Sequence, residues 1–313
     1  MKRKSVQTNI DDFWYDDDKP IKKEILKVAV NKNSSNNNEI KKKRRRKKMV
    51  KRWFFGFVFL IFWGIFLFTG LKVIMWHLDN KNTSEAIDEF NEITDVNEIH
   101  DEGELVNEPE SKESDYWYYI KFPMIDVSFD ELMKKNTDTV GWINVNNTNI
   151  NYPVVQTKDN DYYLNHSYDK SINEAGWVFM DFRNDKSFNN RNTIIYAHSR
   201  LDKTMFGSLS KVLKSDWYKN KDNHIIKIST PHENSLWQIF SVYKIKEETY
   251  YITTDFNSDS AYLDFLNTLK SRSKYNFDVN LSSNDNVITL STCYSDTERT
   301  VVHAKKIKKL DRN

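Results

Sequence analysis

An uncharged apolar run at residues 53–71 constrains this chain most, because it separates the parts that can fold on the two sides of a membrane. At 1.5 Å per residue, a helix of that length is about what is needed to cross a hydrocarbon core roughly 30 Å thick. Trp53 and Trp76 stand where interfacial aromatic residues are expected. The sequence therefore predicts one transmembrane helix over residues 53–76.

A dense basic cluster, residues 41–48 with Lys51 and Arg52, comes immediately before this run. The positive-inside rule keeps such a cluster in the cytoplasm, where it also attracts anionic lipid, so residues after 76 are expected outside the cell. A nucleic-acid patch and a cleavable signal peptide are the alternatives. Topology explains the charges better, and the run is long, starts late and lacks a small-x-small cleavage site. We expect membrane lipid as a partner and no nucleic acid.

Composition divides the rest of the chain. Residues 1–52 are a polar cytoplasmic tail, with at most a transient helix near residues 21–30. Residues 77–115 are acidic and poor in core-forming side chains, which predicts an extracellular stalk with some helix near residues 84–93. Residues 116–313 remain, and they are ample for one domain with its own core.

This last part is predicted to be mainly β. Its short β-rich segments, separated by turn residues, lie at residues 140–145, 150–155, 176–181, 193–197, 225–229, 237–243, 287–292 and 300–307. About eight such strands favour a closed barrel or a sandwich. An S-x-x-E capping box beginning at Ser128 predicts a short helix that ends near Asn136. Apolar residues at helical spacing predict a second helix over residues 261–270, between the sixth and seventh strands.

The only cysteine, Cys293, ends the seventh predicted strand. It rules out an internal disulfide. Arg299 opens the next strand, and residues 294–298 between them resemble a hairpin loop, so Cys293 and Arg299 are expected to face each other. His198 ends another apolar run and can meet the thiol. Alone, the cysteine would more often be a small buried hydrophobe.

These stretches together resemble the class B sortases, membrane-anchored cysteine transpeptidases of Gram-positive bacteria. The matching blocks are TLSTC (289–293), RTVVHAK (299–305), IYAH (195–198), VGWI (140–143), YPVVQ (152–156) and DNDYYL (159–164). The resemblance covers roughly residues 128–309. The chain departs from the family at Ala197, where a glycine is expected, and in the short spacing between Cys293 and Arg299.

The resemblance implies an eight-stranded sortase barrel with an N-terminal helix and a helix inserted between strands 6 and 7. It implies acyl transfer with Cys293, His198 and Arg299 as catalytic residues. Cys293 would attack a Thr carbonyl in the C-terminal sorting motif of a secreted protein, often of the N-P-x-T-[NG] kind. An amine of a cell-wall precursor, of the lipid II type, would resolve the thioester and anchor the protein to peptidoglycan.

Each of these groups has chemistry that suits its role. A thiol with a pKa of about 8.5 needs a base or a lowered pKa to attack a carbonyl, and His198 can take its proton and later protonate the leaving amine. Arg299 can stabilise an oxyanion or hold the substrate backbone. Its alternative is a surface salt bridge with Glu298 or Asp296.

Four further residues are candidate substrate contacts. Ser291 and Tyr196 lie two residues before the cysteine and the histidine and share their faces of the strands. Thr292 and Asn160 complete the set.

Several alternatives stay open from the residues alone. His303 shares a face with Arg299 and could approach the sulfur, although the family pattern favours His198. A cysteine hydrolase or protease would use the same Cys293 and His198, and a non-catalytic surface β-domain would simply bury the thiol. Neither metal-ligand spacing of histidines nor a nucleotide-binding motif is present, so we expect no cofactor and no metal site.

Overall fold

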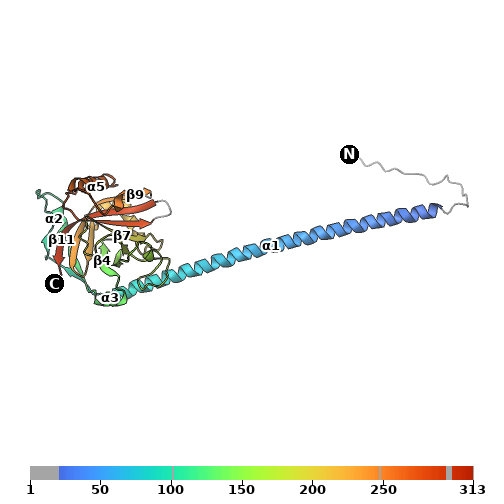
Figure 1. Ribbon diagram of the computed structural model, residues 1–313, viewed down its shortest axis with the longest axis horizontal. Helices are drawn as coiled ribbons and strands as arrows, with labels where there is room; N and C mark the ends of the chain where they lie inside the picture. Colours follow the sequence, from blue (N-terminus) through green and yellow to red (C-terminus); the bar gives the residue numbers. More distant parts are fainter. Residues whose placement is uncertain (1–20, 101, 247, 294–297, 313) are drawn as a thin grey trace. The chain divides into compact units, whose positions relative to one another are not determined.

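The computed structural model describes residues 21–100, 102–246, 248–293 and 298–312. The chain divides into two compact units, residues 1–73 and 74–313. Helix α1 (Ile21–Ile93) begins in the first unit and is drawn as one unbroken helix in Figure 1. Its stretch Asn36–Phe90 is long and apolar enough to cross a membrane, and the predicted span lies inside it. Large side chains of the span, such as Trp53 and Phe62, are exposed.

A closed β-barrel forms the centre of the second unit. Its strands are β4 (Thr139–Val145), β5 (Asn151–Val155), β6 (Phe179–Met180), β7 (Asn192–His198), β8 (Ile225–Ser229), β9 (Glu233–Lys246), β10 (Val287–Cys293) and β11 (Glu298–Asp311). Their order is β10-β7-β6-β5-β4-β8-β9-β11, and an additional β10–β11 pairing closes the ring. This confirms the predicted eight-stranded barrel and decides against a sandwich.

Two of the pairings in the barrel are parallel, β7 with β10 and β5 with β6, and the others are antiparallel. β-Branched and aromatic side chains of the strands fill the interior, as their preference for a pleated, buried surface predicts. Trp142, Ile228, Ile239, Leu290 and Val302 are all fully buried. The core therefore comes from strands throughout the domain and holds the ends of β7 and β10 in a fixed register.

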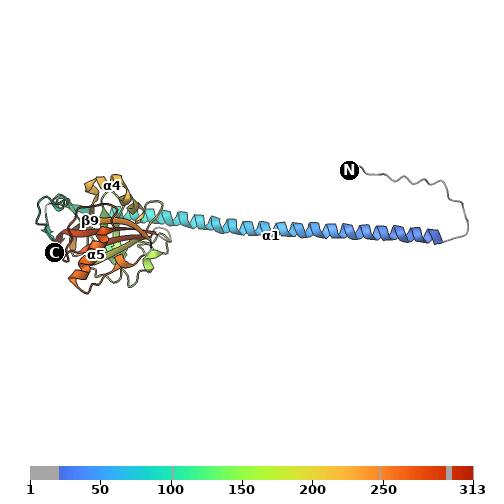
Figure 2. The ribbon, with the colours of Figure 1, turned by 90° about the horizontal axis from the view of Figure 1, so that it is seen from above.

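Helices pack around the barrel. They are α2 (Tyr116–Tyr119), α3 (Asp130–Lys135), α4 (Ser215–Lys219) and α5 (Asp259–Ser271). Helix α5 confirms the helix predicted between the sixth and seventh strands, and it lies against β9 (Figure 2). Ser258 caps its first turn by accepting from the Ala261 N–H, and Leu266 and Leu269 are buried on its inner face.

The short helix predicted to end near Asn136 is confirmed, but the capping box predicted at Ser128 is wrong. Helix α3 begins at Asp130, and the residue before it, Phe129, takes the N-cap position without a side-chain hydrogen bond. The backbone N–H of Ser128 instead donates to the carbonyl of Asp95, 3.3 Å away. That bond continues the pairing of β1 (Val96–Ile99) with β3 (Met124–Val127), so the strand, not the helix, uses Ser128.

The stalk predicted at residues 77–115 also needs correction, because it belongs to the second unit and contributes to its core. Besides β1, it supplies β2 (Glu104–Leu105), which pairs with β11. Phe90 is only 3% exposed and makes edge-on contacts with Tyr168 and Trp177, at 4.6 and 5.5 Å between ring centroids.

This segment joins the core through a narrow stripe of inward-facing side chains on the last turns of α1. The inward-facing side chains are Thr83, Ala86, Ile87 and Phe90. They recur at the spacing that puts residues on one face of a helix. The acidic residues around them face solvent, so the composition of the whole segment hides the stripe.

Candidate active site

The register of β7 and β10 brings two predicted catalytic positions together. In this parallel pair Cys293 is the direct partner of His198, and Ser291 is the partner of Tyr196. Both strands therefore deliver their last residue at the same end of the barrel. The sequence alone could not show this, because the two strands lie far apart along the chain.

Arg299 comes from the strand on the other side of β10. In the antiparallel pairing of β10 and β11, Ser291 is opposite Val301. The paired register ends there, two residues short of Cys293 and Arg299, so the facing of these two residues stays a prediction. The predicted hairpin loop falls mostly on residues 294–297, which lie outside the described residues.

The imidazole of His198 is held by a backbone carbonyl. Its Nε2 lies 2.7 Å from the oxygen of Leu164, and a carbonyl can only accept, so Nε2 carries a proton. In the neutral ring Nδ1 is then the acceptor nitrogen. Gly176 closes the space beside the ring: a Cβ built there would come within 3.1 Å of His198 Cδ2 and 2.5 Å of the Tyr163 oxygen.

His303 occupies a different place. It is opposite Thr289 on β10, and at about 3.3 Å per residue Thr289 and Cys293 are roughly 13 Å apart along the strand. Its Nδ1 lies 2.9 Å from Thr289 Oγ1 and its Nε2 lies 2.8 Å from the Tyr243 hydroxyl. Burial lowers the pKa of His303 to about 3. It is thus a neutral core residue with both nitrogens engaged.

A cavity of about 260 Å³ opens beside His198. Its lining residues are Asn160, Leu164, Phe179, Tyr196, Ala197, Glu248, Thr249, Tyr251, Ile252 and Arg299. The predicted residues Asn160, Tyr196 and Arg299 therefore share one cavity. Most of the other lining side chains are apolar, and Arg299 brings positive charge to them.

Ser291 and Thr292 lie elsewhere. Each is only 1% exposed, and the Ser291 hydroxyl is 3.0 Å from that of Tyr251. Ser291 therefore reaches the cavity only through Tyr251, which lines it. Both residues are better placed to support the wall than to touch a ligand.

The chain was compared with known families and structures. A model of the sortase domain matches residues 143–307. Sortase B of Listeria monocytogenes is 35% identical over 246 residues, which cover 77% of this chain and 89% of that protein. The chain belongs to the class B sortases. Members of this family are cysteine transpeptidases, so this sortase is an enzyme of that class.

Solved structures agree with this membership. A Bacillus anthracis protein described as similar to sortase B has a TM-score of 0.58 at 35% identity, covering 74% of this chain and 97% of that one. A Staphylococcus aureus sortase B–substrate complex has a TM-score of 0.54 at 42% identity, covering 57% and 84%.

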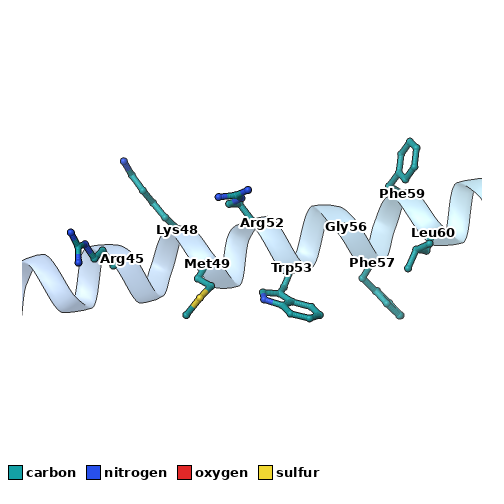
Figure 3. A pocket seen from close by; sticks show the side chains of 9 residues that line it. All are labelled: Arg45, Lys48, Met49, Arg52, Trp53, Gly56, Phe57, Phe59 and Leu60. Atoms are coloured by element: carbon teal, nitrogen blue, oxygen red, sulfur yellow. The ribbon is translucent and has the colours of Figure 1, made fainter.

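Another hollow on this sortase, of about 850 Å³, lies far from these residues in sequence and has no comparable chemistry. Figure 3 shows that its side chains, including Arg52, Trp53 and Phe57, all come from one stretch of α1. A surface formed by a single helix does not converge on a ligand. It belongs instead to the apolar stretch of α1 and the basic cluster beside it.

Sequence reasoning missed three contributors to the site. The Leu164 carbonyl is a backbone group, which no side-chain pattern reveals. Gly176 was placed at the start of a predicted strand, whereas its φ of +59° belongs to a turn. Asp181 was the last residue of the same predicted strand. It lies behind the cavity wall, and only the residues that surround it in the structure reveal its connection to the site.

Proposed function

We propose that this sortase cleaves the C-terminal sorting motif of a secreted protein after Thr and transfers the acyl group to an amine of a cell-wall precursor. The observation that carries the proposal is the β7–β10 register, which makes Cys293 and His198 direct neighbours. A cavity lined by Tyr196, Ala197 and Arg299 adjoins the end of β7, and the related S. aureus enzyme has been solved as a substrate complex. The motif would be of the N-P-x-T-[NG] kind and the amine of the lipid II type.

The first half-reaction forms a thioester. The Cys293 thiol gives its proton to His198 Nδ1, since the Leu164 carbonyl keeps the Nε2 proton in place. The sulfur attacks the Thr carbonyl carbon to form a tetrahedral intermediate. As the intermediate collapses, the C–N bond breaks and the imidazolium protonates the leaving amine.

The second half-reaction reverses these roles. The nitrogen of the incoming amine attacks the thioester carbonyl carbon, and His198 takes a proton from that amine. The C–S bond breaks, and the sulfur leaves as a thiolate that is reprotonated by the imidazolium. Transfer exceeds hydrolysis only if the site favours the amine over water.

Arg299 is proposed to stabilise the oxyanion in both steps. Its half-buried guanidinium lines the cavity, and at any relevant pH it stays charged. Glu298, the salt-bridge partner considered from the sequence, forms an ion pair with Lys244 at 2.5 Å. Asp296, the other partner considered from the sequence, lies outside the described residues.

The test uses the full-length chain in detergent micelles with a quenched peptide carrying Asn-Pro-Ala-Thr-Asn, with and without added triglycine. Cleavage that depends on Cys293 and a product that contains triglycine are expected. Cleavage without triglycine incorporation would favour the hydrolase. A thiol that resists alkylation under native conditions, in a protein without cleavage, would favour the surface β-domain.

We also propose that the N-terminus is cytoplasmic and that residues 77–313 are extracellular. The support is the basic cluster at residues 41–48, immediately before the apolar stretch of α1.

A further inference from the structure

A buried carboxylate lies behind the wall of the substrate cavity. Asp181 follows β6 directly and is 0% exposed. Arg183 holds it with a two-pronged contact, Nε to Oδ1 at 2.8 Å and Nη2 to Oδ2 at 2.7 Å. The backbone N–H of Arg183 adds a third bond to Oδ1 at 3.0 Å. Such paired, charge-assisted bonds are strong and geometrically specific.

Two more bonds to the same carboxylate come from residues that line the cavity. The Tyr196 hydroxyl donates to Asp181 Oδ2 at 2.9 Å, and Asn160 Nδ2 donates to it at 3.1 Å. Asn160 is fixed at its other end as well, since its Oδ1 accepts the Phe182 N–H at 3.0 Å. Tyr196 and Asn160 therefore turn their polar atoms toward Asp181.

Arg183 also connects Asp181 to another segment that lines the cavity. Its Nη2 also donates to the carbonyl of Ile252, 3.0 Å away. Ile252 belongs to the segment between β9 and α5 that lines the cavity together with Thr249 and Tyr251. One carboxylate and one guanidinium thus tie together side chains and backbone from three separate segments around the cavity.

The carboxylate stays ionised in this position. Burial on its own would raise the pKa of Asp181, but the bonds from Arg183 and Tyr196 outweigh it and lower the pKa. An isolated buried carboxylate would be very costly, so the partners are required once the charge is there. Arg183 itself keeps 37% of its side chain exposed, which places the pair at the edge of the core.

We propose that Asp181 and Arg183 form a positioning unit that sets the shape of the substrate cavity by fixing Tyr196, Asn160 and the Ile252 backbone. The inference rests on the proposed function, because the cavity is taken to bind the sorting peptide. Asp181 acts through these residues, and it does not take part in the reaction at Cys293. Its loss should therefore weaken peptide binding while leaving the reactivity of the thiol intact.

The experiment compares wild type with Asp181→Asn in the full-length chain, using the quenched Asn-Pro-Ala-Thr-Asn peptide. Asp181→Asn should raise KM about tenfold or more, the usual effect of losing a hydrogen bond to a charged group, with kcat nearly unchanged. The rate of Cys293 alkylation should not change. Hydrogen exchange should become faster in residues 159–164 and 249–253. Arg183→Lys, which loses the two-pronged contact at a partly exposed position, should give the same pattern if Asp181→Asn does not fold.

Asp185→Asn is the matched control, because this exposed carboxylate in the same loop accepts from the backbone of Ser187 and does not touch the cavity. In the Asp181→Asn background, Tyr196→Phe should raise KM less than it does in the wild type, since the charged acceptor of its hydroxyl is already gone.

Three results would overturn the proposal. KM and hydrogen exchange could both stay at wild-type values, or Asp185→Asn could have the same effect. Alternatively, KM, kcat, alkylation rate and melting temperature could all shift together, as expected for a merely structural carboxylate. If wild type does not cleave the peptide, the proposed function fails, while the hydrogen-exchange comparison still tests the positioning.

Discussion

At the scale of single residues, the contact between His198 and the Leu164 carbonyl decides which nitrogen can act as a base. The sequence indicates His198 as a site residue because it ends an apolar run. It cannot indicate the Leu164 carbonyl, since every residue has a backbone carbonyl. It also cannot exclude His303, which strand alternation places on the same face as Arg299. Only the register, which sets His303 opposite Thr289, separates the two histidines.

Arg299 can be tested by the change that keeps its charge. Arg299→Lys loses the planar fork of donors, so a hydrogen-bonding role in the transition state predicts a fall in kcat on the order of 10²-fold. Steady-state cleavage of the sorting peptide measures it, and His303→Ala serves as a comparison. Near-full turnover of Arg299→Lys with an inactive His303→Ala would show that the third catalytic group has been assigned wrongly.

Gly176 should be needed for the orientation of His198. Its φ is +59°, and a Cβ would press against the Tyr163 oxygen and the imidazole. Gly176→Ala is expected to destabilise the fold by about 1–3 kcal/mol and to lower kcat about tenfold or more by tilting the ring. Gly103→Ala is the control, with φ +105° and a contact to the Lys309 oxygen away from the cavity. It should cost similar stability without lowering the kcat of the folded protein, so an equal loss in both variants would point to strain alone.

Neutral buried histidines should make the fold sensitive to acid. The unfolded chain protonates His303 near pH 6.5, whereas burial lowers its pKa in the folded state to about 3. The unfolded state thus binds more protons between these values, and stability is lost as the pH falls below about 6.5, by up to about 1.4 kcal/mol per pH unit.

Urea unfolding at several pH values measures this dependence. Burial also lowers the pKa of His224, to about 4, so both residues contribute with the same sign. His303→Gln should reduce the slope between pH 6 and pH 4 without removing it. An unchanged slope in that variant would mean that His303 is not a neutral buried residue in the folded protein.

At the scale of elements, local patterns predicted which segments form strands and that α5 forms a helix. β-Branched runs and the spacing of Tyr262, Phe265, Leu266 and Leu269 are local signals, and both survive in the structure. The strand order is not local. The parallel pairing of β7 with β10 joins segments separated by α4, β8, β9 and α5, so its register depends on how the whole barrel closes. The hydrogen bonds around Asp181 could not be predicted for the same reason, because they join segments that are far apart in the sequence.

At the scale of the whole molecule, α1 carries two different surfaces on one helix. The stretch at residues 53–71 is apolar all round, which suits a lipid environment, and the last turns have the narrow stripe that ends at Phe90. In the sequence, composition places a boundary between these two surfaces, after residue 76, and so it assigns the stripe to a stalk. The catalytic domain therefore uses the last turns of α1 as a part of its core.

Phe90 provides the test of this dependence. Phe90→Ala should lower the free energy of unfolding by about 3–5 kcal/mol, because the ring fills a fully packed site against Tyr168 and Trp177. Asp88→Ala, on the exposed side of the same turn, should have almost no effect. A chain starting at residue 116 also lacks β1 and β2, and it should melt well below one starting at residue 74. Equal melting temperatures for the two truncated chains would restore the stalk interpretation.

The orientation across the membrane can be tested with the chain's single cysteine removed. In a Cys293→Ala background, Asn36→Cys lies before the basic cluster and Glu131→Cys lies on the exposed face of α3. A membrane-impermeant maleimide added to intact protoplasts should label position 131 and spare position 36, because the basic residues at 41–48 hold the N-terminal side in the cytoplasm. Both positions should react after detergent is added, which controls for accessibility. Labelling of position 36 alone in intact protoplasts would place the catalytic domain inside the cell, where it could not meet a secreted substrate or a cell-wall amine, and the proposed function would fail with the topology.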